Sequence, residues 1–390
     1  MEFGPALHIF RMIQQYYDQI CAEWGVAPTS DVYTGYEAVY DQLRALSKQA
    51  WTAADDVGKE AIQQAAFDIY RAVGVVPITY YSLEGCRQQI SDVANASKAV
   101  KKRTLAIGGS AGSAFGRFWF PGMQEAAWGN NDSVGLRARF NHDNKLKRAI
   151  KLCYTIRDNG EQSVFPAALR TALELVNGGT VTNFKPMNAR AIWEYLCPSW
   201  GGRVLDFSAG FGGRMMGAMT SRMRYHYTGI DPNTKTFAGL QALGSLINEV
   251  SGTDFDVHCV GSEDFAPEPG SYDAAFSSPP YFNCERYNDE PTQCYNKFTD
   301  LTAWFEQYVE PTLTMVHTGL ARDGVYAVNI ADYNQGKESF SIVDQWKTIS
   351  EKVGFEYVET VNMLLTTRPG VGNNREEKST KTEGIYVFRK

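Results

Sequence analysis

The chain lacks several patterns that would place it in a familiar class. Its seven cysteines are odd in number, scattered and never spaced as C-x-x-C, so nothing indicates a disulfide framework or a zinc site. Its five histidines show no metal-ligand spacing. The chain does not open with a basic and then apolar signal pattern, and no apolar run approaches the roughly 18 residues of a membrane span. We therefore expect a soluble cytoplasmic protein that binds no metal.

The net charge of −6 hides a sorted distribution. Residues 1–97 carry six Lys and Arg against twelve Asp and Glu, whereas residues 98–151 carry eleven against three. We call residues 98–151 the basic block; its candidate cations are Lys98, Lys101, Lys102, Arg103, Arg117, Arg137, Arg139, Lys145, Lys147 and Arg148. Aromatic residues are interleaved with them: Phe115, Phe118, Trp119, Phe120, Trp128 and Phe140. Such a mixture suits a nucleic-acid groove, and the alternative is a solvated face beside an ordinary aromatic core.

Hydrophobic spacing divides the chain into two parts. Residues 1–181 show apolar spacing near three and four, which predicts a mainly helical N-terminal domain. Residues 182–390 alternate between strands and helices, which predicts an α/β domain with a Rossmann-like, seven-stranded sheet and helices on both faces. The expected strands are 203–207, 225–231, 255–260, 272–277, 325–330, 355–365 and 384–389.

Two features of the α/β part point to a nucleotide-like cofactor. The first strand ends at Asp206 and runs into the glycine-rich residues 207–213. Glycines at such a turn let the backbone approach a ligand closely. Asp231 ends the second strand about 20 residues later, where a carboxylate can accept hydrogen bonds from ribose hydroxyls. Asp264, after the third strand, either accepts from an adenine amino group or caps an exposed turn.

Ser278-Pro279-Pro280-Tyr281, at the end of the fourth strand, is the most specific pattern. The prolines fix the backbone and lack N–H groups, so nearby carbonyls face no competing donors. The amino group of cytosine or adenine is a poor nucleophile because its lone pair is delocalised into the ring. Hydrogen bonds from that group to Ser278 Oγ and the Pro279 carbonyl would free the pair, with Tyr281 stacking on an extruded base.

These residues resemble the motifs of class I S-adenosylmethionine-dependent amino-methyltransferases, whose catalytic motif is [D/N/S]-P-P-[Y/F/W]. The resemblance spans about residues 182–390 and implies S-adenosylmethionine as cofactor and a base in DNA as substrate. Ser277-Ser278 before the prolines favours cytosine N4 as the target, and residues 281–293 are similar to DNA methylases carried by bacteriophages. The implied cofactor-binding residues are Phe184, Pro186, Asp206, Ser208, Ala209, Gly210, Phe211, Gly212, Asp231, Pro232, Asp264, Phe265 and Ser277. Family members usually carry Phe at the position of Ser208, so the aromatic wall of the cofactor pocket is left unassigned.

The α/β part has no room for a target-recognition insert, so we expect recognition to fall to the basic block and to surface loops. Arg368 and Arg375, between the last two expected strands, are further candidates for contact with the DNA backbone. Three alternatives stay open: an adenine-N6 DNA methyltransferase, an RNA base methyltransferase, and a non-catalytic nucleic-acid-binding protein with a degenerate fold. Cys284 is interpreted as a small buried or pocket-side thiol.

Overall fold

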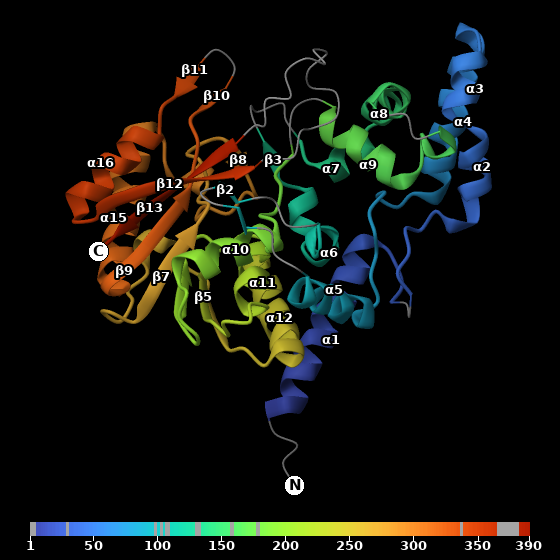
Figure 1. Cartoon of the computed structure of the whole chain (residues 1–390). Coiled ribbons are helices and arrows are strands. Elements are labelled where there is room, and N and C mark those ends of the chain that lie inside the picture. The colour runs from blue at the N-terminus through green and yellow to red at the C-terminus, as the bar shows by residue number, and fades with distance from the viewer. Residues whose placement is uncertain are drawn as a thin grey trace.

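The computed structural model describes residues 5–28, 31–96, 100–101, 104–105, 110–128, 134–156, 160–176, 180–335, 338–364 and 382–390. Its centre is a nine-stranded sheet with the order β1-β2-β12-β13-β9-β7-β4-β5-β6 (Figure 1). The seven strands of the α/β part are β4 (Arg203–Asp206), β5 (His226–Ile230), β6 (Phe255–His258), β7 (Tyr272–Ser277), β9 (Leu320–Asn329), β12 (Glu356–Leu364) and β13 (Thr382–Arg389).

Six of these seven strands run parallel to one another, and β13 is antiparallel to both of its neighbours, β9 and β12. The predicted Rossmann-like, seven-stranded sheet is therefore confirmed. The two further strands were not predicted. They are β1 (Val100–Lys101) and β2 (Thr104–Leu105), an antiparallel pair from the basic block, and β2 pairs in parallel with β12.

Alternating burial along the central strands explains why helices cover both faces. Val204 and Ala274 belong to a core with α10 (Pro186–Leu196), α11 (Gly213–Met219) and α12 (Thr234–Ser251). Their neighbours Leu205 and Ala275 point to the opposite face and pack with α14 (Leu301–Trp304), the π-helix η5 (Phe305–Val309), α15 (Glu310–Gly319) and α16 (Val343–Val353). Successive side chains of a strand point to opposite faces, so each strand seals both layers.

Short elements complete the α/β part. They are η4 (Ser262–Asp264), β8 (Glu285–Arg286), α13 (Cys294–Lys297), β10 (Tyr333–Gln335) and β11 (Glu338–Phe340). β10 and β11 form a hairpin of their own, and β8 pairs with a strand from the N-terminal part. This second pairing joins the N-terminal part to the α/β part beside the cavity described below.

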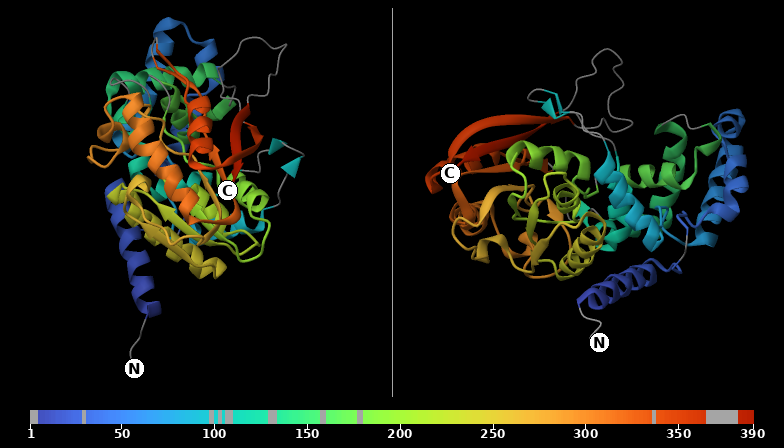
Figure 2. Two further views of the ribbon diagram at one scale, coloured as in Figure 1. Left: turned by 90° about the vertical axis from the view of Figure 1, so that its left-hand side faces the viewer. Right: turned by 60° about the horizontal axis from the view of Figure 1, so that its bottom comes forward.

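Helices dominate residues 1–181, as predicted (Figure 2). The elements are α1 (Pro5–Trp24), η1 (Glu37–Val39), α2 (Tyr40–Ala45), α3 (Lys48–Ala53), α4 (Asp56–Val73), α5 (Leu83–Asn95), α6 (Ser113–Trp119), η2 (Pro121–Gln124), β3 (Ala127–Trp128), α7 (Leu136–Asn141), α8 (Asp143–Ile156), η3 (Gly160–Gln162) and α9 (Pro166–Leu175). Capping sets several bounds: the Asp55 carboxylate accepts from Gly58 N at 2.8 Å where α4 begins, and Gly74 ends that helix with φ +76°.

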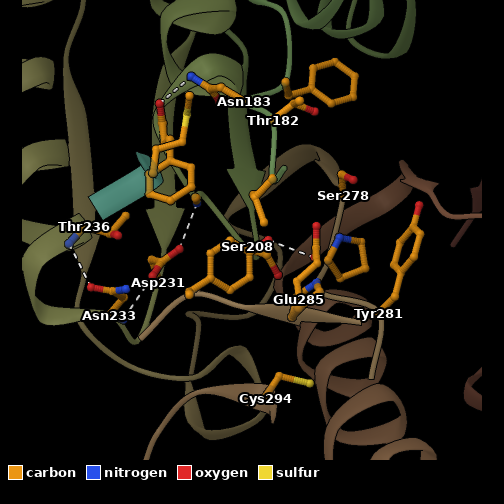
Figure 3. A pocket seen from close by; sticks show the side chains of 18 of the residues that line it. Thr182, Asn183, Ser208, Asp231, Asn233, Thr236, Ser278, Tyr281, Glu285 and Cys294 are labelled. Carbon is orange, nitrogen blue, oxygen red and sulfur yellow. Dashed lines mark hydrogen bonds between the residues drawn. The ribbon is translucent and has the colours of Figure 1, made fainter. Parts of the chain in front are cut away.

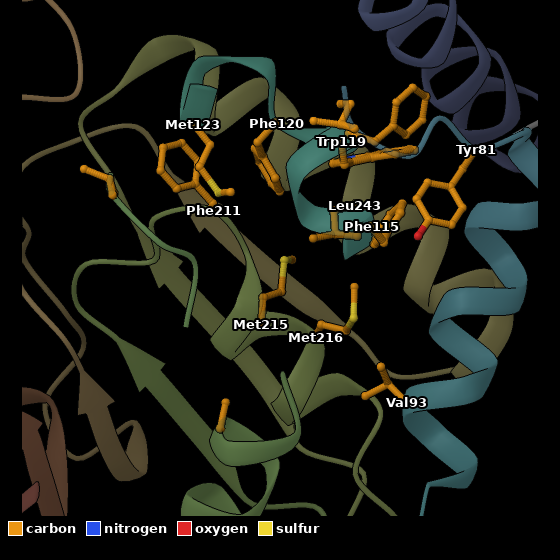
Figure 4. Close-up of a cluster of buried hydrophobic side chains, with 14 of the residues drawn as sticks. Tyr81, Val93, Phe115, Trp119, Phe120, Met123, Phe211, Met215, Met216 and Leu243 are labelled. Carbon is orange, nitrogen blue, oxygen red and sulfur yellow. The ribbon is translucent and has the colours of Figure 1, made fainter. Parts of the chain in front are cut away.

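The helical part and the α/β part share one hydrophobic core (Figure 4). α1 packs along α12, and the Trp119 indole donates to the Gly239 carbonyl of α12 at 3.1 Å. Phe120 lies so close to α12 that a Cβ at Gly239 would be 2.5 Å from its ring. The Phe120 ring therefore packs against the α12 backbone where only a glycine leaves room for it.

Among the described residues, no helix combines the length and the apolarity that crossing a bilayer requires. The same residues contain no group of three or more His, Cys, Asp or Glu side chains placed to hold a metal ion.

Candidate active site

A cavity of about 550 Å³ opens at the carboxyl ends of the parallel strands. The loops after β4, β5, β6 and β7 line one part of it, and side chains from α6, η2, β3 and α7 close it from the N-terminal part. Figure 3 shows the labelled side chains in two groups, with Asp231, Asn233 and Thr236 on one side and Tyr281 and Glu285 on the other. Open α/β sheets bind ligands at this edge.

The glycine-rich loop after β4 forms part of the cavity wall through Phe207, Ser208, Gly210 and Phe211. Gly210 has φ +55°, a left-handed conformation that favours glycine. A Cβ on Gly213 would lie 1.9 Å from a backbone carbonyl of the segment preceding α10, so this position admits no side chain. The loop is thus held tightly beneath that segment.

Asn183 links the glycine-rich loop to the segment that precedes α10, a role that the sequence did not reveal. Its Nδ2 donates to the Phe211 carbonyl at 2.7 Å, and its Oδ1 accepts from Gly213 N at 3.2 Å. Phe184, expected at the cofactor, lines the cavity next to it. Pro186 begins α10 and does not line the cavity, so its role is to start that helix.

Asp231, which was predicted to bind the ribose, lies in the cavity wall. Its two carboxylate oxygens accept from Gly210 N at 2.8 Å and from Asn233 N at 3.0 Å. Burial raises the pKa of Asp231 to about 6, although those two hydrogen bonds act in the opposite direction. A carboxylate oxygen can accept more than one hydrogen bond, so both retain capacity for hydroxyl groups. Pro232 lines the cavity beside it.

Asp206 requires a correction. Its carboxylate is completely buried, and its oxygens accept from Arg214 Nε at 2.9 Å, Tyr227 OH at 2.9 Å and Ser277 Oγ at 2.9 Å. Neither Asp206 nor Ser277 lines the cavity, because this network lies beneath the glycine-rich loop. Asp206 positions the loop through Arg214, which donates to the Ser208 carbonyl, and Ser277 holds Asp206 in place.

Three more expected cofactor contacts do not line the cavity: Ala209, Gly212 and Phe265. Ala209 is a buried residue of the loop and donates its N–H to the Ile230 carbonyl at 2.8 Å. Gly212 has φ +69°, and a Cβ there would lie 2.5 Å from Leu243. Phe265 packs against the His258 ring, with the centroids 4.8 Å apart. All three shape the wall from behind.

The acid at the end of β6 is Glu263 and not the predicted Asp264. The Asp264 side chain is 62% exposed and pairs with Lys297 at 3.0 Å, outside the cavity. Glu263 is only 6% exposed, lines the cavity, and holds the same Lys297 at 2.6 Å. The short helix η4 decides which of two adjacent acids turns inward, and the sequence pattern does not resolve that choice.

All four residues of the Ser278–Tyr281 turn line the same cavity as the glycine-rich loop. The Tyr281 hydroxyl donates to Glu383 Oε1 at 3.1 Å and lies 3.5 Å from the Asn329 carbonyl. Its ring meets Trp128 edge-on with centroids 6.3 Å apart. These contacts fix the ring in one orientation, which a stacking platform requires.

Two carboxyl groups beside Tyr281, Glu285 and Glu383, were not predicted. Glu285 Oε2 accepts from Tyr287 OH at 2.9 Å, and burial raises the pKa of Glu285 to about 7. Burial also raises the pKa of Glu383. Glu285 is four residues from the turn and could have been suspected, whereas Glu383 arrives from β13, about a hundred residues later.

The cations of the basic block take different positions in the structure, some buried and some near solvent or the cavity. Arg139 is completely buried and donates to the carbonyls of Val134 at 2.8 Å and Leu173 at 3.0 Å, so its assignment to a nucleic-acid surface is wrong. Arg137 donates to the Glu23 carbonyl at 3.0 Å, with its guanidinium 4.5 Å from the ring of Trp24. Both arginines serve internal packing of the helical part.

Other cations of the block lie closer to solvent or to the cavity. Arg117 lines the cavity, and its Nε lies 3.8 Å from Glu174 Oε1. On α8, Lys145 and Lys147 are half-buried, Arg148 is exposed, and Lys147 Nζ lies 4.7 Å from the ring centre of Phe67. Five cations fall outside the described residues, Lys98, Lys102, Arg103, Arg368 and Arg375, as does the side chain of Lys101.

The interleaved aromatic residues follow the alternative interpretation. Phe115, Phe118, Trp119, Phe120 and Phe140 are buried in the shared core and are not available to stack on bases. Trp128 is the exception because it lines the cavity beside Tyr281. Cys284 is a buried free thiol, in agreement with its interpretation.

No protein-family model matches the sequence, and no curated protein is similar to it. Among solved structures, the chain is similar to an S-adenosylmethionine dependent methyltransferase from Mesorhizobium loti, with 14% identity and a TM-score of 0.34 over 51% of this chain and 96% of that one. It is also similar to a methyltransferase from Pyrococcus furiosus, with 15% identity and a TM-score of 0.34 over 52% of this chain and 82% of that one. A third similar structure is TrmN from Thermus thermophilus, with 15% identity and a TM-score of 0.34 over 53% of this chain and 48% of that one. We infer the function from the cavity and not from these similarities.

Proposed function

We propose that the protein transfers a methyl group from S-adenosylmethionine to the exocyclic amino group of a base in DNA, namely N4 of cytosine. The observation that carries this proposal is that one cavity is lined both by the glycine-rich loop with Asp231 and by the Ser278–Tyr281 turn. A methyl donor and an acceptor base must meet within bonding reach, and a shared cavity provides that meeting place.

The cavity residues fit the cofactor. Asp231 suits ribose hydroxyls, Glu263 suits an adenine amino group, and the loop before α11 admits close approach to its backbone. Ser113 Oγ and Asn188 Oδ1 also line the cavity, are buried, and have no hydrogen-bond partner among the described residues. Buried polar atoms are normally paired, so these two favour a polar ligand.

When bound, S-adenosylmethionine supplies an electrophilic methyl group on a positively charged sulfur. Ser278 Oγ and the Pro279 carbonyl accept hydrogen bonds from the target amino group and return its lone pair to the nitrogen. Tyr281 holds the base plane by stacking, and its tether to Glu383 keeps the ring from rotating. The chain's contribution is therefore positioning of the two reacting atoms.

DNA as the substrate is supported by two features of the N-terminal part. Its residue Trp128 lines the cavity beside Tyr281, which supports a role for residues 1–181 in recognising what surrounds the target base. On α8, Lys145 and Arg148 are spaced by three residues, which places them on one helical face. Such cations suit the phosphate backbone beside an extruded base.

The test is a methylation assay on duplex DNA of mixed sequence, followed by mass spectrometry of the nucleosides. N4-methylcytosine is the expected product, and Tyr281→Ala should abolish it while Trp200→Ala, a change at an exposed aromatic residue, should not. N6-methyladenine alone, or activity on RNA alone, would replace the target. Absence of S-adenosylmethionine binding in calorimetry would favour the non-catalytic alternative.

A further inference from the structure

Selecting cytosine requires more than acceptors for its amino group. The ring atom next to that amino group, N3 in cytosine and N1 in adenine, is a hydrogen-bond acceptor, whereas uracil and guanine carry an N–H there. A flipped base is read on this edge. The pocket therefore needs a donor beside the acceptors of the Ser278–Tyr281 turn.

Glu285 is the candidate for this donor. It lines the cavity with Ser278 and Tyr281, and Figure 3 shows its side chain between Ser208 and Tyr281. Its position is set by the pairing of β3 with β8, where Glu285 lies opposite Trp128. The Tyr287 hydroxyl holds Oε2 at 2.9 Å, which orients the carboxyl plane.

We propose that Glu285 is a specificity-determining residue that donates a hydrogen bond from its protonated carboxyl group to the ring nitrogen of the target base. The inference rests on the proposed function, because it presumes that a base occupies the cavity beside Ser278–Tyr281. A protonated carboxyl can donate one hydrogen bond, whereas a carboxylate can only accept. The protonated form matches cytosine, and the ionised form matches uracil.

The surroundings of Glu285 move its titration into the neutral range. Burial raises its pKa to about 7; hydrogen bonds from the Tyr287 hydroxyl and the Tyr281 backbone oppose this rise, the nearby Glu383 adds to it, and Arg214 opposes it. The remaining titratable groups that interact with it are Tyr281, Tyr287, Tyr333, Cys284 and Cys294. An ordinary exposed glutamate would be ionised at this pH and could not donate.

A second buried group also indicates a ligand with acceptor atoms. Gln293 is 5% exposed and lines the cavity, and its Nε2 has no hydrogen-bond partner among the described residues. A buried amide donor without a partner is costly unless a ligand satisfies it. The cavity thus offers donors as well as the acceptors of the turn.

The test measures binding and requires no methyl transfer. Labelled duplexes carry cytosine, uracil or 3-deazacytosine, which lacks the ring acceptor, opposite an abasic site, so that extrusion costs little. Fluorescence anisotropy gives the affinities at pH 6 and pH 8.5. At pH 6 the wild-type protein should bind the cytosine duplex about tenfold more tightly than the other two, the value of one hydrogen bond. At pH 8.5 this preference should disappear.

Two variants separate donation from simple packing. Glu285→Gln keeps a donor at every pH, so its preference for cytosine should persist at pH 8.5, whereas Glu285→Ala should show no preference at either pH. A wild-type preference that is unchanged by pH and survives in Glu285→Ala would overturn the inference. If the protein forms N4-methylcytosine but the Glu285 variants keep the wild-type preference for cytosine, only the inference fails. If the Glu285 variants change the preference as expected but the protein methylates no base, the proposed function fails instead.

Discussion

Replacing Glu285 by Gln should change how the stability of the protein depends on pH. The ordinary pKa of this group is 4.5, and burial raises it to about 7 in the folded protein. Between these two values the folded state keeps a proton that the unfolded chain has released. The free energy of unfolding must therefore fall as the pH rises through this window, because ionisation favours the unfolded chain.

The magnitude follows from the size of the shift. Each pKa unit corresponds to about 1.36 kcal/mol, so the full difference approaches about 3 kcal/mol. Glu285 is half-buried in the wall of a cavity that admits water, so we expect about 2 kcal/mol after solvent screening. Glutamine cannot ionise. The stability of Glu285→Gln relative to wild type should therefore increase by about 2 kcal/mol between pH 5 and pH 8.

Urea denaturation followed by tryptophan fluorescence measures this difference at a series of pH values. The matched control is Glu351→Gln on α16, where the glutamate side chain is exposed and its replacement should leave the profile parallel to wild type. Parallel profiles for Glu285→Gln and wild type from pH 5 to pH 8 would refute the reasoning. They would mean that the folded protein does not hold a proton on Glu285.

Other expectations test the network, the loop and the surface. Asp206→Ala should lower the free energy of unfolding by about 3–5 kcal/mol, because it leaves a buried guanidinium without its carboxylate; a loss under about 1 kcal/mol in urea would contradict the network. Gly213→Ala should weaken S-adenosylmethionine binding in calorimetry, since its Cβ would strike a carbonyl 1.9 Å away, and unchanged affinity would contradict the close approach. The double variant Lys145→Glu, Arg148→Glu should weaken DNA binding and flatten the dependence of that binding on salt. Arg139→Met should destabilise the fold and leave the salt dependence unchanged. If instead only Arg139→Met changed the salt dependence, Lys145 and Arg148 would not contact DNA.

Local patterns were enough to predict the sheet and much of the cavity wall. Strand length, alternation and the turn after each strand depend on neighbouring residues, so the expected strands at 203–207 and 272–277 agree with β4 and β7 to within a residue. The carboxyl ends of parallel strands share one edge, so Asp231 and the Ser278–Tyr281 turn were expected there together.

What the sequence did not predict depends on side-chain direction and distant pairing. Glu383 reaches Tyr281 only because β13 inserts antiparallel between β9 and β12. Asp206 matched a cofactor motif but belongs to a buried network that the motif does not describe. Arg139 looked like a surface cation because charge counting cannot see that backbone carbonyls of α9 surround it.

The central claim is that one cavity holds both cofactor and base, and paired binding measurements test it most directly. Calorimetry with S-adenosylmethionine and anisotropy with the cytosine duplex are applied to Asp231→Ala and Tyr281→Ala. We expect Asp231→Ala to lose cofactor affinity and Tyr281→Ala to keep it while binding the duplex more weakly. Cofactor affinity that survives in Asp231→Ala, together with duplex affinity that survives in Tyr281→Ala, would contradict the claim.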